Sequence, residues 1–327
     1  MDERQVPPTM GHKSLRKLPL VLWLAFCMLA VPSISRTRFW WAQNDAPPSI
    51  IKVNVLVLDR SNHSIRTLPQ SAFRLFEDGK NQPISFFSDE ELPLKYCVLV
   101  DNTGSIRSRI NEIRDAARIV IGNHKPDDSA FIVSMSDGGA TLSIGWSSDK
   151  KALIDTIDSL KPPSGSTRLL DAMYKCSELI AEAKPAPNRR ALILISDGLD
   201  NGSSHKLDKL LRRLDQDDVQ VYVVGLVPPL DASGLFRISS RERSMDLLER
   251  ISEETGGRVF FPKSSEELRL YANHVLDSIR SEIVLGYVPT RPLEKDSYRK
   301  ISVKVEAPGA DKYRVISRRH VGFDKKN

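Results

Sequence analysis

The sequence predicts an α/β protein: a doubly wound, mostly parallel sheet with helices on both faces, plus a small antiparallel β module. Two observations predict it. Between residues 94 and 281, continuous apolar runs alternate with helix-length segments, as in parallel strands covered on both faces. On either side of this region, short runs alternate apolar and polar residues, as in strands with one exposed face.

The central region contains five clear strand candidates and one weaker one. The clear strands are expected at 96–100, 130–135, 191–195, 219–224 and 258–261, and the weaker one at 142–146. Helices are expected at 106–121, 150–160, 169–183, 206–215, 244–255 and 265–281. This order of strands and helices defines an α/β domain at 94–281.

The flanks supply the β module. In the N-terminal segment, 50–90, Val53, Val55 and Val57 share one face of a strand, and the C-terminal segment, 282–327, repeats this alternation. A few short strands at one end of a chain cannot bury themselves. We therefore expect the two segments to pair with each other, so that the α/β domain is inserted into one discontinuous β module.

The first 35 residues have the pattern of an export signal. Arg16 and Lys17 precede an apolar run at 18–31, and small residues follow at 33–35. The run is shorter than the ~20 residues that cross a bilayer as a helix. Residues 1–35 are therefore predicted to be a signal peptide and 36–49 a linker. This predicts a periplasmic, cell-envelope or secreted protein, with membrane contact only if the signal is retained as an anchor.

The net charge argues against one class of partner, and the positions of the cysteines argue against a disulfide. A formal net charge of +6 in 327 residues, spread through the chain, is not the signature of a nucleic-acid binder. After signal removal, Cys97 in an apolar strand and Cys176 in a helix-like segment would remain. Both are predicted to be buried thiols rather than a disulfide.

Five oxygen-bearing side chains stand near the ends of apolar runs. The motif DNTGS follows the strand at 96–100, SDG follows the strand at 191–195, and GST precedes the helix at 169–183. Because ligands of parallel sheets collect at the carboxyl ends of the strands, we expect these loops to converge. The oxygen donors suit a hard divalent cation, Mg²⁺ or Mn²⁺. The candidate metal ligands are Asp101, Thr103, Ser105, Thr167 and Asp197.

This constellation resembles the von Willebrand factor type A domain and its metal-ion-dependent adhesion site. In that family an Asp-x-Ser-x-Ser loop, a Thr and an Asp from three loops bind the cation. The resemblance implies that the first loop is 101–105, the second-loop residue is Thr167 and the third-loop residue is Asp197. Thr103 departs from the family pattern, since it keeps the hydroxyl but adds a methyl group.

The flanks resemble exported bacterial proteins of the "von Willebrand factor A related" type. The motifs are EDG at 77–79 before the domain, and LGY at 285–287 and YRKI at 298–301 after it. The resemblance implies a binding module that recognises an exposed carboxylate of a protein partner through the metal. It implies no enzyme activity, no catalytic residue, no organic cofactor and no small-molecule substrate.

Two other interpretations stay open. The motif DNTGS also resembles the phosphorylation loop of aspartate-nucleophile phosphatases, in which Asp101 would attack phosphorus with magnesium present. Against it, Asn102 stands where that loop has Lys, and Thr167 has no role. A third interpretation is a structural envelope protein with an inactive metal site.

Overall fold

The computed structural model describes residues 50–136, 139–161, 164–183, 189–227, 235–291 and 297–323. The predicted signal peptide, 1–35, and the linker, 36–49, lie outside these residues. None of the helices in the described ranges has both the length and the apolar character needed to cross a bilayer.

The α/β domain is built on a six-stranded sheet with the order β10-β9-β8-β5-β6-β7. Its first five strands are parallel, and β7 is an antiparallel edge strand next to β6. The weaker candidate at 142–146 is thus confirmed as a strand. The strands are β5 (Leu94–Asp101), β6 (Ser129–Ser136), β7 (Gly139–Ser147), β8 (Arg189–Ser196), β9 (Gln220–Gly225) and β10 (Val259–Phe260).

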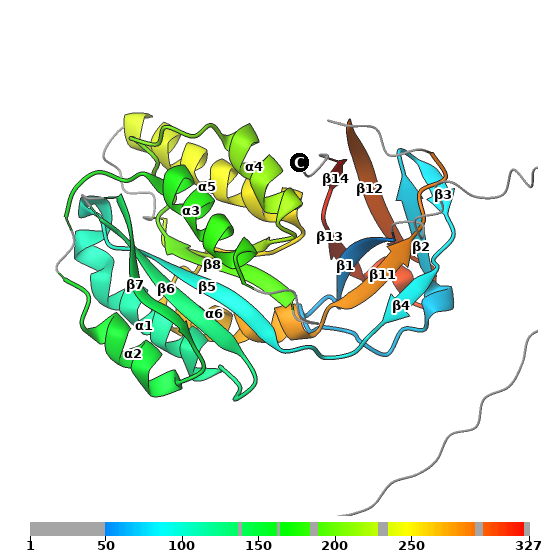
Figure 1. The fold of residues 1–327 in the computed structure, drawn as a ribbon, viewed down its shortest axis with the longest axis horizontal. Helices are drawn as coiled ribbons and strands as arrows, with labels where there is room; N and C mark the ends of the chain where they lie inside the picture. The colour runs from blue at the N-terminus through cyan, green and yellow to red at the C-terminus, as the bar shows by residue number, and fades with distance from the viewer. Residues whose placement is uncertain are drawn as a thin grey trace, which may run out of the picture. The chain divides into compact units, whose positions relative to one another are not determined.

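Helices cover both faces of this sheet, as Figure 1 shows. On one face, α1, α2 and α6 pack on alternate residues of β5 such as Tyr96 and Val98. On the other face, α3, α4 and α5 pack on Cys97 and Leu99. The helices are α1 (Ile110–Gly122), α2 (Lys150–Asp158), α3 (Leu169–Ala181), α4 (Leu207–Gln216), α5 (Leu235–Thr255) and α6 (Ser265–Arg280). The fold class predicted from the sequence is confirmed.

The flanks form two four-stranded antiparallel sheets, and each sheet combines strands from both ends of the chain. Their orders are β13-β1-β11-β4 and β14-β12-β2-β3. One apolar core, with Val55, Leu75 and Leu285 fully buried, lies between them. The N-terminal strands are β1 (Ile51–Leu58), β2 (Phe73–Glu77), β3 (Lys80–Gln82) and β4 (Phe86–Ser88). The C-terminal strands are β11 (Ile283–Tyr287), β12 (Ser297–Val305), β13 (Arg314–Ser317) and β14 (His320–Phe323).

Two elements differ from the sequence expectation. Helix α5 begins at residue 235, nine residues before the predicted start at 244. The sequence did not reveal this first part because residues 235–243 carry no regular apolar stripe. The helix expected at 106–121 is divided: a 3₁₀ helix, η2 (Gly104–Arg109), precedes α1. This short element carries the chain from the end of β5 to α1.

At Gly257, between α5 and β10, the backbone passes close to strand β9. A Cβ atom at Gly257 would lie 1.9 Å from the Val221 carbonyl oxygen, which belongs to β9. We expect Gly257→Ala to lower the free energy of unfolding by about 1–3 kcal/mol, because strand β9 would have to shift. Gly122→Ala at the end of α1, where no atom lies within 4 Å of the added Cβ, is the matched control and is expected to be neutral or slightly stabilising. Urea denaturation measures both variants, and equal stabilities would contradict the argument.

Candidate metal site

The candidate site lies at the carboxyl ends of β5 and β8, where three loops meet. Asp101 is the last residue of β5, and Asp197 directly follows β8. Thr167 lies two residues before α3. Asp101, Thr103, Thr167 and Asp197 are buried, whereas Ser105 is exposed. The site therefore reaches solvent at Ser105.

The first loop is organised around the carboxylate of Asp101. Its Oδ1 accepts hydrogen bonds from the Thr103 backbone N–H at 3.1 Å and from the Thr103 hydroxyl at 2.8 Å. Its Oδ2 accepts from the Ser196 hydroxyl at 2.6 Å. A hydrogen bond from a backbone N–H to the carboxylate of an aspartate two positions earlier is common in turns. Here it gives the short DNTGS segment a defined conformation.

The three predicted hydroxyls come together at Thr103. Thr103 Oγ1 lies 3.1 Å from Ser105 Oγ and 3.0 Å from Thr167 Oγ1. Thr167 is 64 positions from Thr103 in the sequence, so this contact is tertiary. The third loop adds Asp197, whose carboxylate accepts from the Leu199 backbone N–H at 3.0 Å and from Ser105. All five residues predicted from the sequence are thus neighbours.

Backbone contacts hold the first two loops together. Gly104 N–H donates to the Gly165 carbonyl at 3.1 Å, and Ser164 N–H donates to the Asn102 carbonyl at 3.2 Å. A Cβ at Gly104 would lie 3.2 Å from the Gly165 oxygen, closer than side chains usually pack. The glycine in DNTGS therefore permits the approach of the loop that carries Thr167.

Three further residues position the site, and we did not predict their roles from the sequence. Ser196 holds Asp101, as described above. Asn201 makes two bonds to Thr167: its Oδ1 accepts from the Thr167 N–H at 3.0 Å, and its own N–H donates to the Thr167 carbonyl at 3.1 Å. Asp200 accepts from the Leu169 N–H at 2.9 Å and from Ser203, so it caps α3. Ser196 and Asp200 lie close to Asp197 in the sequence, which was a weak signal, whereas Asn201 carried none.

The oxygen spacing fits a small, hard cation. Magnesium binds oxygen in an octahedron at 2.0–2.1 Å, which places neighbouring ligand oxygens about 3 Å apart. The contacts among Asp101, Thr103, Ser105 and Thr167 span 2.8–3.1 Å. The described residues contain no cluster of three or more His, Cys, Asp or Glu side chains suited to a metal. The candidate site would not be such a cluster, because only two of its five residues, Asp101 and Asp197, are of these types.

The electrostatics also favour a cation. Burial and, to a smaller extent, the charge of Asp197 raise the pKa of Asp101 to about 6, although hydrogen bonds from Ser196 and Thr103 oppose the rise. Burial likewise raises the pKa of Asp197, opposed by hydrogen bonds from Leu199 and Ser105 and by the charge of Arg109. Two neighbouring buried carboxylates repel each other, and a divalent cation between them would offset that repulsion.

Magnesium affinity is expected to fall as the pH is lowered through 6. A carboxyl group with a raised pKa is protonated below that value, and a protonated carboxyl cannot serve as an anionic ligand. At pH 5 about one tenth of the metal-free Asp101 is ionised, so the affinity should be roughly ten-fold weaker than at pH 7. Calorimetric titrations of magnesium at both pH values test this, and equal affinities would contradict it.

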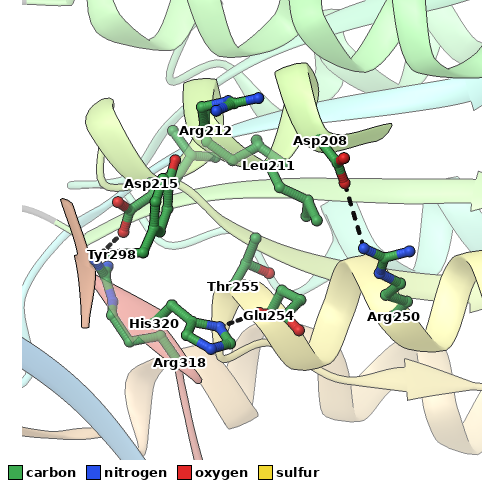
Figure 2. Close-up of a pocket in the computed structure, with 12 residues that line it drawn as sticks. Asp208, Leu211, Arg212, Asp215, Arg250, Glu254, Thr255, Tyr298, Arg318 and His320 are labelled. Atoms are coloured by element: carbon green, nitrogen blue, oxygen red, sulfur yellow. Dashed lines mark hydrogen bonds and ion pairs between the residues drawn. The ribbon is translucent and has the colours of Figure 1, made fainter. Parts of the chain in front are cut away.

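A cavity of about 320 Å³ lies elsewhere, between α4, α5 and the C-terminal strands. Figure 2 shows two pairs among its charged residues, Arg318 with Asp215 at 3.2 Å and His320 with Glu254 at 2.6 Å. At its edge, Arg250 pairs with Asp208 at 3.3 Å. These contacts join the C-terminal strands to the α/β domain, so the cavity is part of an intramolecular interface.

Proteins similar to this chain occur among solved structures, all at low sequence identity. No curated protein matches the chain. Among solved structures, an aerotolerance-related membrane protein from Bacteroides fragilis has 16% identity and a TM-score of 0.45, covering 56% of this chain and 98% of that one. BatB from Bacteroides thetaiotaomicron has 13% identity and a TM-score of 0.43, covering 57% and 100%. A von Willebrand factor type A protein from Catenulispora acidiphila has 10% identity and a TM-score of 0.47, covering 86% and 76%.

One part of the chain matches a known family model in sequence. Residues 96–199 match the family model of the von Willebrand factor type A domain. The matched segment begins in β5 and ends just after Asp197, so it contains all three loops of the candidate site. Residues 96–199 are therefore similar to a von Willebrand factor type A domain, and the α/β domain that contains them is inserted between the strands of a β module.

Proposed function

We propose that this chain is an exported, metal-dependent protein-binding module that recognises an exposed carboxylate of a protein partner. The convergence of three hydroxyls and two carboxylates from three loops carries this proposal. The residues that would hold Mg²⁺ or Mn²⁺ are Asp101, Thr103, Ser105, Thr167 and Asp197.

The residues have distinct roles in this proposal. Thr103, Ser105 and Thr167 supply neutral oxygens, while Asp101 and Asp197 supply charge directly or through water. A cation held by few anionic ligands supplies an electrophilic position for a partner's carboxylate. Ser105 is the exposed member of the set, so a partner would approach from its side. Ser196 and Asn201 hold Asp101 and Thr167 in place.

The contacts of Asp101 argue against a phosphatase. A nucleophilic carboxylate needs an oxygen that is free to attack phosphorus. Here both oxygens of Asp101 accept hydrogen bonds from Thr103 and Ser196, and the residue is fully buried. The proposal is therefore a binding protein and not an enzyme. A phosphatase would release phosphate from a generic phosphoester in the presence of magnesium, which is directly measurable.

Export is supported by the sequence pattern of residues 1–35. The basic residues, the 14-residue apolar run and the small residues after it are together typical of a signal peptide. The proposed location is the periplasm, the cell envelope or the medium. Mass spectrometry of the N-terminus of the protein recovered from cells tests cleavage near residue 35.

Thr167 separates the binding proposal from its alternatives, because only this proposal gives its hydroxyl a function. We expect Thr167→Val, which keeps the shape but removes the oxygen, to weaken magnesium binding at least ten-fold. Thr167→Ser keeps the hydroxyl and is expected to remain within a few-fold of the natural protein. Isothermal titration with Mg²⁺ and Mn²⁺ measures both variants.

The outcomes distinguish the proposals. If neither the natural protein nor Thr167→Ser binds either cation, the site is inactive and the structural-protein interpretation holds. If Thr167→Val binds as tightly as Thr167→Ser, the ligand assignment is wrong. Capture of an envelope protein that is released by chelator and lost in Thr167→Val would support the partner-binding role.

A further inference from the structure

Two thiols lie next to each other in the core of the α/β domain. Cys97 belongs to β5 and Cys176 to α3, and neither side chain is exposed. Their sulfur atoms are 3.2 Å apart, although the residues are 79 positions apart in the sequence. Both are free thiols in the structure, and their burial agrees with the sequence prediction.

The position of this pair connects it to the candidate metal site. Cys97 is four residues before Asp101 on the same strand. Cys176 lies on the helix that begins two residues after Thr167. A covalent bond between the sulfurs would therefore tie the strand that carries one candidate loop to the helix that follows another.

We propose that Cys97 and Cys176 form a disulfide when the chain folds under oxidising conditions, cross-linking β5 to α3. A disulfide bond is about 2.05 Å long, so the two sulfurs need to approach by about 1.1 Å. Apolar side chains surround the pair on this face of the sheet, among them Phe131, Val133 and Met173. The disulfide needs an oxidant to form and does not need the metal. This proposal therefore does not depend on the proposed metal site.

The oxidant is a disulfide of a low-molecular-weight thiol or of a thiol oxidoreductase. One cysteine thiolate attacks a sulfur of the oxidant, forming a mixed disulfide and releasing one thiolate of the oxidant. The second cysteine thiolate then attacks the Cys sulfur of that mixed disulfide and releases the other. Two thiols are oxidised, one disulfide is reduced, and the two released thiolates take up the two protons.

Burial determines when this exchange takes place. The folded protein gives an oxidant no access to either sulfur, and burial raises the pKa of the Cys97 thiol well above its ordinary value. Thiolate is the reactive form, so the folded, reduced protein should resist oxidation. Oxidation is expected during folding, before α3 packs on β5.

The experiment uses the full chain with Cys27→Ser, which leaves Cys97 and Cys176 as its only cysteines. The protein is unfolded and refolded with oxidised glutathione, and a parallel sample is refolded with reductant. Maleimide labelling in denaturant counts the thiols, and peptide mass mapping identifies the linked pair. We expect no labelled thiol after oxidative refolding, two after reduction, and one peptide pair joined through Cys97 and Cys176.

The effect on stability is the second measurement. The disulfide would close a loop between residues 79 positions apart. We expect this to raise the melting temperature of the oxidised form by roughly 5–10 °C over that of the reduced form. The oxidised and reduced forms have the same sequence, so no mutation confuses this comparison. Cys176→Ala, refolded with and without oxidant, controls for effects of glutathione elsewhere and should show no difference.

Several results would overturn the proposal. Two labelled thiols after oxidative refolding would mean that no bond forms, and a glutathione adduct on each cysteine would mean that the second exchange fails. A bond that forms without raising the melting temperature would mean that the native packing of α3 on β5 does not accommodate it.

Discussion

Asp101→Ala is expected to abolish magnesium binding while the protein remains folded. Asp101 provides one of two candidate carboxylates, and its Oδ1 also fixes the Thr103 hydroxyl at 2.8 Å. The change therefore removes a charged ligand and releases a neutral one. We expect the magnesium affinity to fall beyond detection, a loss of at least a hundred-fold.

The fold should tolerate the loss of this carboxylate. At neutral pH, a buried carboxyl with a pKa of about 6 instead of 3.8 costs the metal-free fold on the order of 3 kcal/mol. The sign follows from linkage: the raised pKa means that the native state holds its proton more tightly, so ionisation at pH 7 destabilises it. Asp101→Asn, which is close in shape and uncharged, should melt in chelator at or above the temperature of the natural protein.

Magnesium-dependent melting supplies the measurement. Magnesium at a hundred times its dissociation constant stabilises a binding protein by about 2.7 kcal/mol, which is roughly 5–10 °C for a domain of this size. The natural protein should show this shift, and both Asp101 variants should show none. Asp155→Asn changes an exposed carboxylate on α2 that pairs with Lys151, and it should retain the full shift. Unchanged magnesium affinity in Asp101→Ala would show that the ligand assignment is wrong.

Local sequence patterns were sufficient to predict most of the fold. Continuous apolar runs revealed β5, β6, β8 and β9, because buried parallel strands need no polar face. Strand β7 gave a weaker pattern because it is an edge strand with exposed residues such as Leu142 and Trp146. The order of the strands, with β5 between β8 and β6, is set by contacts distant in the sequence, which local patterns do not encode.

Some residues of the candidate site could also be predicted from local sequence patterns, and others could not. The five predicted residues could be found because each lies in a short motif next to a predicted strand or helix. Asn201 could not, because its contact with Thr167 joins residues 34 positions apart. Asp200 could not be assigned its role either: it is partly buried and its carboxylate accepts from the Leu169 N–H at the start of α3, 31 positions away. Its role depends on where the helix begins in space.

Glu282→Ala is expected to be the most destabilising substitution at the junction between the α/β domain and the β module. Glu282 lies between α6 and β11, and it is fully buried. Its carboxylate accepts from Arg189 at 3.0 Å, from Gln220 at 2.8 Å and from Tyr222 at 2.6 Å. Gln220 in turn accepts from Asn54 of β1 at 2.8 Å, so the network connects the module to the domain.

The stability is expected to fall strongly because the positively charged Arg189 would lose its partner. The Arg189 side chain is only 2% exposed, and without Glu282 its charge would be buried and uncompensated. Removing one partner of a buried ion pair costs about 3–5 kcal/mol, which corresponds to a fall in melting temperature of roughly 10 °C. Glu306→Ala is the matched control: Glu306 pairs with Arg74 on the surface, and its loss should cost less than about 1 kcal/mol.

A double substitution tests whether the unpaired charge is the cause. If it is, Arg189→Met together with Glu282→Leu should be markedly more stable than Glu282→Ala, because no buried charge remains. If the double variant is as unstable as the single one, the hydrogen bonds to Gln220 and Tyr222 are what the junction requires. Urea denaturation followed by both fluorescence and circular dichroism would also show whether the β module unfolds before the α/β domain. We expect one transition in the natural protein and two in Glu282→Ala, because this network joins the two parts of the fold.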